Sequence, residues 1–116
     1  MEDEESIRKL AIEILGHYGY AVLSAGDGEE ALRIAGEHKG EIDLLLTDVI
    51  MPWMGGPELF ERIRQLRPGI KVLYVSGYTD NAIVHQGVLD PGIAFLQKPY
   101  SPISLARKVK EVLEEN

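Results

Sequence analysis

The chain has 116 residues, of which 45% are hydrophobic, and a net charge of −7, so we expect one globular domain without the basic face that nucleic-acid binding needs. It has no cysteine, which excludes disulfides and thiolate metal sites. With no signal peptide and no apolar run of about 20 residues, it is expected to be cytoplasmic and to make no contact with a membrane.

Helical and strand-like patterns alternate from the start of the chain. Apolar residues recur at helical spacing over residues 5–17 and predict an amphipathic helix, after which residues 20–24 predict a short strand. Asp27 with Glu30 three residues later is a capping-box pattern. It predicts a second helix that ends near residues 39–40.

The second half of the chain continues this alternation. The expected strands are residues 43–48, 71–76 and 93–97. The expected helices are one marked by Leu59, Phe60 and Ile63 that ends at residues 67–69, a short one at 81–88, and one over about 104–113. Such alternation with short connections predicts an α/β fold, in which a parallel sheet carries helices on both faces.

Three chemically capable side chains stand at or just after expected strand ends, namely Asp48, Ser76 and Lys98. In an open parallel sheet, active sites gather beyond the carboxyl ends of the strands. We therefore expect these three residues to carry the chemistry.

Four segments resemble response-regulator receiver domains, and together they extend over nearly the whole chain. They are Glu2-Asp3, residues 44–56 (LLLTDVIMPWMGG), residues 75–77 (VSG) and residues 95–99 (FLQKP). The last segment, with residues 76–80, is most like receivers fused to hybrid sensor histidine kinases. The resemblance implies a single domain over residues 1–116 with a flavodoxin-like, doubly wound parallel sheet of strand order 2-1-3-4-5.

The resemblance also implies a magnesium site. Asp3 and Asp48 would bind Mg2+ directly, Glu2 would act through a water molecule, and the backbone carbonyl of Ile50 would be a further ligand. Oxygen atoms of this kind are the ligands that Mg2+ prefers. Crowded carboxylates repel one another without a cation, so we expect phosphorylation to depend on a divalent ion.

The same resemblance assigns the phosphoryl chemistry to Asp48. It would accept the phosphoryl group of a phosphohistidine from a histidine kinase or a histidine phosphotransfer domain. Lys98 would neutralise negative charge on the phosphoryl oxygens. The Ser76 hydroxyl would then move toward the phosphoryl group and Phe95 would rotate into the space that it leaves. Through this switch the domain would change a protein-interaction surface, and it would not be an enzyme for outside substrates.

The sequence departs from the family at its beginning. Receivers begin with an apolar strand of about five residues before the acidic pair, whereas this chain begins Met1-Glu2-Asp3. We therefore expect an N-terminally truncated domain without its first strand. In the order 2-1-3-4-5 that strand is internal, so its loss would leave neighbouring strands unpaired and the core incomplete. A swapped element or a second chain would compensate, giving a homodimer or swapped oligomer.

Other interpretations are open for each candidate residue. Asp48 also fits a strand-end cap, Lys98 a surface lysine, Ser76 a cap, Phe95 a core aromatic, and Glu2-Asp3 an acidic first helical turn. An alternative function is a receiver-fold interaction module that works without phosphorylation. A third is an aspartyl-phosphate hydrolase, but such enzymes typically carry a second acid two residues after the nucleophile, where this chain has Ile50.

Overall fold

The computed structural model describes residues 5–49, 54–76, 94–97 and 100–114. In chain order the elements are helix α1 (Glu5–His17), helix α2 (Gly28–Glu37), strand β1 (Leu44–Asp48), helix α3 (Gly56–Leu66), strand β2 (Lys71–Ser76), strand β3 (Phe95–Gln97) and helix α5 (Pro102–Glu114). The predicted bounds of α1 and β2 coincide with these, and the other observed elements lie within a few residues of prediction. The predicted helix at 81–88 lies outside the described residues.

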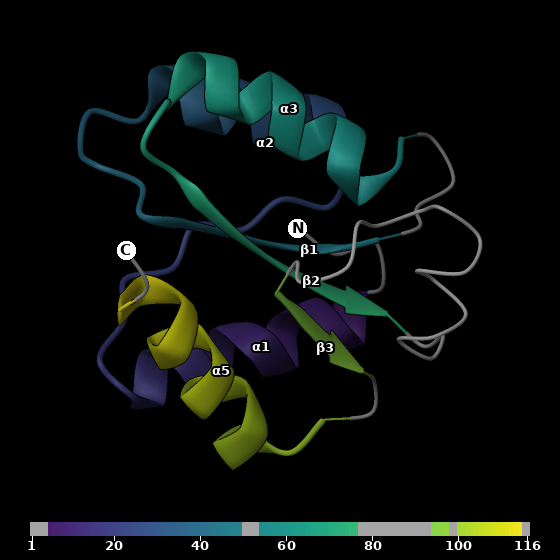
Figure 1. Cartoon of the computed structure of the whole chain (residues 1–116), viewed down its shortest axis with the longest axis vertical. Helices are drawn as coiled ribbons and strands as arrows, with labels where there is room; N and C mark the ends of the chain where they lie inside the picture. Colours follow the sequence, from purple (N-terminus) through teal and green to yellow (C-terminus); the bar gives the residue numbers. More distant parts are fainter. Residues whose placement is uncertain (1–4, 50–53, 77–93, 98–99, 115–116) are drawn as a thin grey trace.

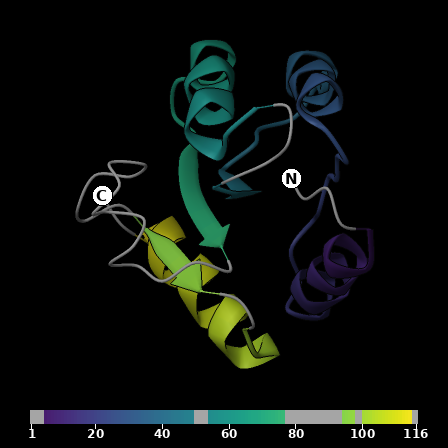
Figure 2. The same ribbon diagram turned by 90° about the vertical axis from the view of Figure 1, so that its right-hand side faces the viewer.

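The three strands form a parallel sheet in the order β1-β2-β3. Helices α2 and α3 cover one face, and α1 and α5 cover the other (Figures 1 and 2). The predicted α/β architecture is therefore confirmed. The order agrees with the last three strands of the expected 2-1-3-4-5 arrangement, whose first two positions stay a prediction. No helix among the described residues combines the length and apolarity that a membrane crossing requires.

Strand β1 is apolar on both of its faces. Leu45 belongs to the core beneath α2 and α3, together with Leu59 and Ile63 of α3. Leu44 and Leu46 pack instead on the core formed with α1 and α5. This alternation confirms that β1 is a strand covered by helices on both sides.

Local signals at the ends of α1 and α2 explain their bounds. Gly19 has a φ of 92°, and the N–H of Tyr20 donates to the carbonyl of Leu15 (3.1 Å), which is the Schellman arrangement that ends a helix. At the start of α2, Asp27 Oδ1 accepts from the N–H of Glu30 (2.8 Å), as the capping-box pattern predicts. The Glu30 carboxylate accepts from the N–H of Gly26 (3.2 Å), one residue before the cap.

A single arginine joins the ends of α2 and α3. The side chain of Arg67, the C-cap of α3, donates to three backbone carbonyls after and within α2: Nε to Ala35 (3.0 Å), Nη1 to Gly40 (2.6 Å) and Nη2 to His38. A cation at this position satisfies carbonyls that the end of a helix leaves without partners. Arg67 belongs to the segment 67–69 where α3 was predicted to end, and its side chain also holds the end of α2 in place.

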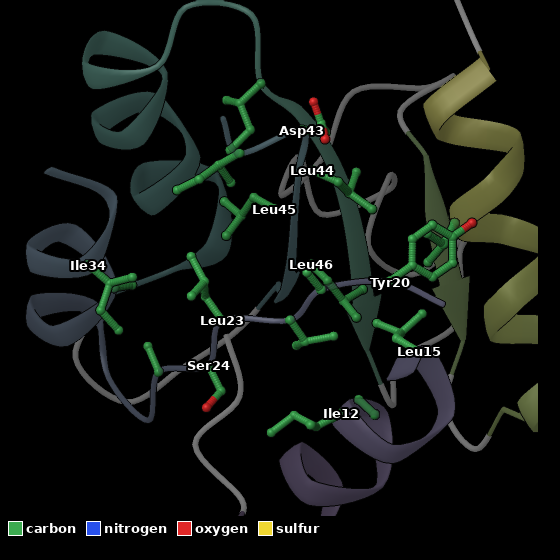
Figure 3. A pocket seen from close by; sticks show the side chains of 18 of the residues that line it. Ile12, Leu15, Tyr20, Leu23, Ser24, Ile34, Asp43, Leu44, Leu45 and Leu46 are labelled. Carbon is green, nitrogen blue, oxygen red and sulfur yellow. The ribbon is translucent and has the colours of Figure 1, made fainter. Parts of the chain in front are cut away.

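The prediction of a strand at residues 20–24 was wrong. The segment belongs to none of the described strands, and a groove of about 390 Å³ separates it from β1 (Figure 3). A strand exists only through hydrogen bonds to a neighbour, and the described part of the sheet offers none on this side of β1. This gap is consistent with the expected absence of an internal strand.

Candidate functional site

Asp48 is the last residue of β1, at the edge where the parallel strands end. Among the residues whose burial the structure describes, it is the one charged residue that is buried, with 5% of its surface exposed. The preceding Thr47 is fully buried, and its hydroxyl donates to the backbone carbonyl of Asp48 (3.1 Å). Burying a carboxylate is costly, so such a residue at a strand end is a strong functional candidate.

The other two strands bring their ends to the same edge. Asp48 is in register with Val75, so Ser76 lies one residue beyond it on β2 and is itself in register with Gln97, the last residue of β3. Lys98 is the next residue in the sequence. The prediction that Asp48 and Ser76 stand at the ends of neighbouring strands is therefore confirmed for the backbone.

The remaining predicted site residues are outside the described part of the chain. These are Glu2, Asp3, Ile50 and Lys98, together with the side chain of Ser76. Their convergence on Asp48 stays a prediction. The described residues on their own contain no group of three acidic or histidine side chains suited to a metal ion, and the predicted magnesium site draws its other ligands from the part that is not described.

A glycine at the start of α3 holds the backbone that follows Asp48. The N–H of Gly56 donates to the carbonyl of Val49 (2.7 Å). A Cβ atom on Gly56 would overlap the carbonyl oxygen of Asp48 and would also lie 3.2 Å from Cδ1 of Tyr74. Only glycine fits this approach without a backbone shift. We predicted no role for Gly56, although the pair Gly55-Gly56 after Met51-Pro52 was the available signal.

Phe95 lies at the beginning of β3 and is half-buried. It packs on a small cluster formed by Val49 and Tyr74, which also contacts Phe60. Phe95 therefore connects through Tyr74 to the residue that follows Asp48. This position is compatible with the predicted switch role and also with a plain core aromatic, so the switch stays a prediction.

Tyr74 is the titratable residue of this cluster. It is 3% exposed, and burial raises its pKa to about 12, with the negative charge of Glu61 as a second cause. A tyrosine hydroxyl is neutral at physiological pH even at its ordinary pKa of 10.0, so the raised pKa has its effect only at alkaline pH.

Comparison with known proteins identifies the family. A family model described as the response regulator receiver domain matches residues 1–110. The sensor kinase CckA of Brucella abortus (strain 2308) is 42% identical over 115 residues, which are 99% of this chain and 12% of that protein. The receiver domain from the hybrid histidine kinase CckA superposes with a TM-score of 0.80 at 42% identity, covering 97% of this chain and 94% of that one.

The chemotaxis protein CheY4 of Vibrio cholerae has the same fold, with a TM-score of 0.82 at 29% identity over 96% of this chain and 92% of that one. The predicted likeness to receivers of hybrid kinases and the flavodoxin-like fold are thereby confirmed. The chain spans only a small share of the length of the sensor kinase that it matches. On these grounds the chain belongs to the response regulator receiver domain family of two-component signalling.

Proposed function

We propose that this receiver domain accepts a phosphoryl group onto Asp48 from a phosphohistidine and transmits the event through a change of its surface. The observation that carries the proposal is the burial of Asp48, the one buried charge among the described residues, at the carboxyl edge of a parallel sheet. That edge is where open α/β sheets bind ligands and place reactive groups. Receiver domains interact with histidine kinases or phosphotransfer proteins, and one of these would be the donor.

In the proposed transfer, a carboxylate oxygen of Asp48 forms a bond to phosphorus while the bond between phosphorus and the histidine nitrogen breaks. The product is an aspartyl phosphate, and the imidazole keeps the electron pair of the broken bond. Catalysis of such a step consists mainly of positioning and charge neutralisation. Gly56 positions the backbone after Asp48, and Lys98 would supply a fixed positive charge.

The donor set suits Mg2+. Asp48, Asp3, the carbonyl of Ile50 and, through water, Glu2 offer only oxygen atoms, which is the chemistry that Mg2+ selects. When bound, the ion would neutralise charge on the phosphoryl oxygens. The buried Asp48 carboxylate supports this assignment, because a cation beside it would offset the cost of its burial.

The conformational change of the switch would pass through the contacts among Val49, Tyr74 and Phe95. These side chains share one cluster, so a change at the end of β1 reaches the outer strand through direct contacts. With Ser76 drawn toward the phosphoryl group, Phe95 would turn inward and alter the surface of β3 and α5. The domain would thus serve as a cytoplasmic phosphoacceptor, and its likeness to the CckA receiver supports a place in a hybrid-kinase phosphorelay.

The test is phosphorylation by acetyl phosphate, and by a phosphorylated histidine phosphotransfer domain, followed by peptide mapping. A hydroxylamine-labile label should appear on Asp48 and should be lost in Asp48→Asn. Asp43→Asn is the matched control, because Asp43 directly precedes the opposite end of the same strand and should keep full labelling. A folded protein that takes no label would favour the phosphorylation-independent interaction module instead.

A further inference from the structure

We propose that Thr47 is a positioning residue for the phosphorylation of Asp48. Its hydroxyl acts through the backbone, by fixing the orientation of the peptide group that joins Asp48 to Val49. The inference rests on the proposed function, because it concerns the same phosphoacceptor. It adds to that function a fully buried residue that acts without touching the phosphoryl donor.

The hydroxyl of Thr47 lies within a strand that is otherwise apolar up to this point. Residues 44–46, which precede it on β1, are all leucine. Thr47 is fully buried, and its partner in the parallel ladder with β2 is the buried Tyr74. Burying a hydroxyl costs free energy unless it forms a hydrogen bond, and valine has a similar shape without this cost. The hydrogen bond that the hydroxyl makes therefore explains its presence better than packing does.

The peptide group between Asp48 and Val49 is held by hydrogen bonds at both ends. At one end, Thr47 Oγ1 donates to the Asp48 carbonyl (3.1 Å). At the other end, the N–H of Val49 donates to the carbonyl of Val75 on β2 (3.0 Å). Because a peptide group is planar, hydrogen bonds at its two ends together fix its rotation about the chain. This rotation sets the dihedral ψ of Asp48, and with it the relation between the Asp48 carboxylate and the backbone that follows.

Gly56 and Thr47 act on the same carbonyl oxygen in different ways. A Cβ atom on Gly56 would overlap the oxygen of Asp48, so the start of α3 limits where this oxygen can move. A close contact of this kind excludes positions, whereas a hydrogen bond favours one direction. The N–H of Gly56 is directed to the next carbonyl, that of Val49 (2.7 Å). The hydroxyl of Thr47 thus supplies the directed attraction at the Asp48 carbonyl.

Two substitutions at Thr47 separate positioning from packing. Thr47→Val keeps the branched shape and removes the donor, so labelling of Asp48 by acetyl phosphate should slow about three- to tenfold, the effect of one neutral hydrogen bond. Thr47→Ser keeps the donor and loses a buried methyl group. It should therefore melt a few degrees lower but keep its labelling rate. This pattern would show that lost stability is not the cause of slow labelling in Thr47→Val.

Two further measurements examine how the hydroxyl acts. Because Thr47 is fully buried, Thr47→Val should lower the labelling rate at saturating acetyl phosphate and leave the concentration for half-maximal rate unchanged. In the absence of metal and donor, the carbonyl 13C resonance of Asp48 should shift in Thr47→Val. The same resonance should keep its position in Thr47→Ser, which retains the hydrogen bond.

The failure of this inference can be told apart from failure of the proposed function. Equal labelling rates in Thr47→Val and the unchanged chain would overturn the role of Thr47 and leave Asp48 as the phosphoacceptor. Equally slow labelling in Thr47→Val and Thr47→Ser would also overturn it, since packing would then explain both. A folded, unchanged chain that takes no label would reject the proposed function itself, and the role of Thr47 with it.

Discussion

Gly56 and Asp48 approach each other so closely that the space between their backbones has no room for a methyl group. A Cβ atom on Gly56 would lie 3.1 Å from the carbonyl carbon of Asp48 and would overlap its carbonyl oxygen. The obstacle is backbone and not the end of a flexible side chain, so it cannot turn aside. The position of the proposed phosphoacceptor therefore depends on the absence of a side chain eight residues later.

Gly56→Ala should displace the backbone after Asp48 and slow labelling by acetyl phosphate about tenfold or more, because small misplacements of a reacting group are costly. It should also lower the free energy of unfolding by about 1–3 kcal/mol through overpacking. The control is Gly36→Ala, since that glycine lies in α2 with no atom near the added methyl group. This control should keep its labelling rate and gain up to about 1 kcal/mol of stability. Equal labelling rates in both variants would contradict the positioning role of Gly56.

Arg67→Met should separate the ends of α2 and α3. The variant loses three hydrogen bonds to backbone carbonyls, and we expect the free energy of unfolding to fall by about 1–3 kcal/mol in urea denaturation. Arg62→Met is the comparison, because the exposed Arg62–Glu58 pair at 3.5 Å should contribute about 0–0.5 kcal/mol. The role of Arg67 would be disproved by equal losses in the two variants.

The raised pKa of Tyr74 predicts a loss of stability at high pH. Unfolding returns the phenol to its ordinary pKa of 10.0, so between about pH 10 and 12 the unfolded chain releases a proton that the folded chain keeps. Stability from this group is complete below pH 10 and declines as the pH rises toward 12. Tyr74→Phe should reduce this decline, whereas Tyr18→Phe, which removes the hydroxyl of a 49% exposed side chain, should not. Urea titrations across this pH range, with tyrosinate absorbance as a second readout, provide the measurement.

Magnesium should stabilise the folded chain by mass action, since the proposed ligands come together only on folding. The melting temperature should therefore rise with MgCl2 in the unchanged chain and in Asp43→Asn, but not in Asp48→Asn. EDTA should abolish labelling by acetyl phosphate. Undiminished labelling in EDTA would be incompatible with the proposed metal dependence.

The parts of the fold that the sequence predicts well are those decided by local patterns. The helical spacing of residues 5–17 and the apolar run ending at Asp48 identify α1 and β1, and Asp27 caps α2 as its neighbours predict. Residues 20–24 carry the same local signal for a strand. A strand also needs a partner that is distant in sequence, and the groove separates this segment from β1. Local preference cannot reveal this, because strands are defined by contacts far away in sequence.

The candidate site was likewise predictable only in part. The position of Asp48 at a strand end follows from the apolar run before it, and the register of β1 with β2 places Ser76 at the same edge. The approach of Gly56 to Asp48 depends on how α3 is placed relative to β1, and the spacing of residues in the sequence does not specify this placement. The burial of Tyr74 among Val49, Phe60 and Phe95 likewise depends on three segments meeting in space.

The contact made by Arg67 gives α2 and α3 a common anchor on one face of the sheet. Because one guanidinium fastens the ends of α2 and α3, these helices form a steady frame on one side of the sheet. Since one side chain links the two helices, a displacement of the end of α3 is expected to carry the end of α2 with it.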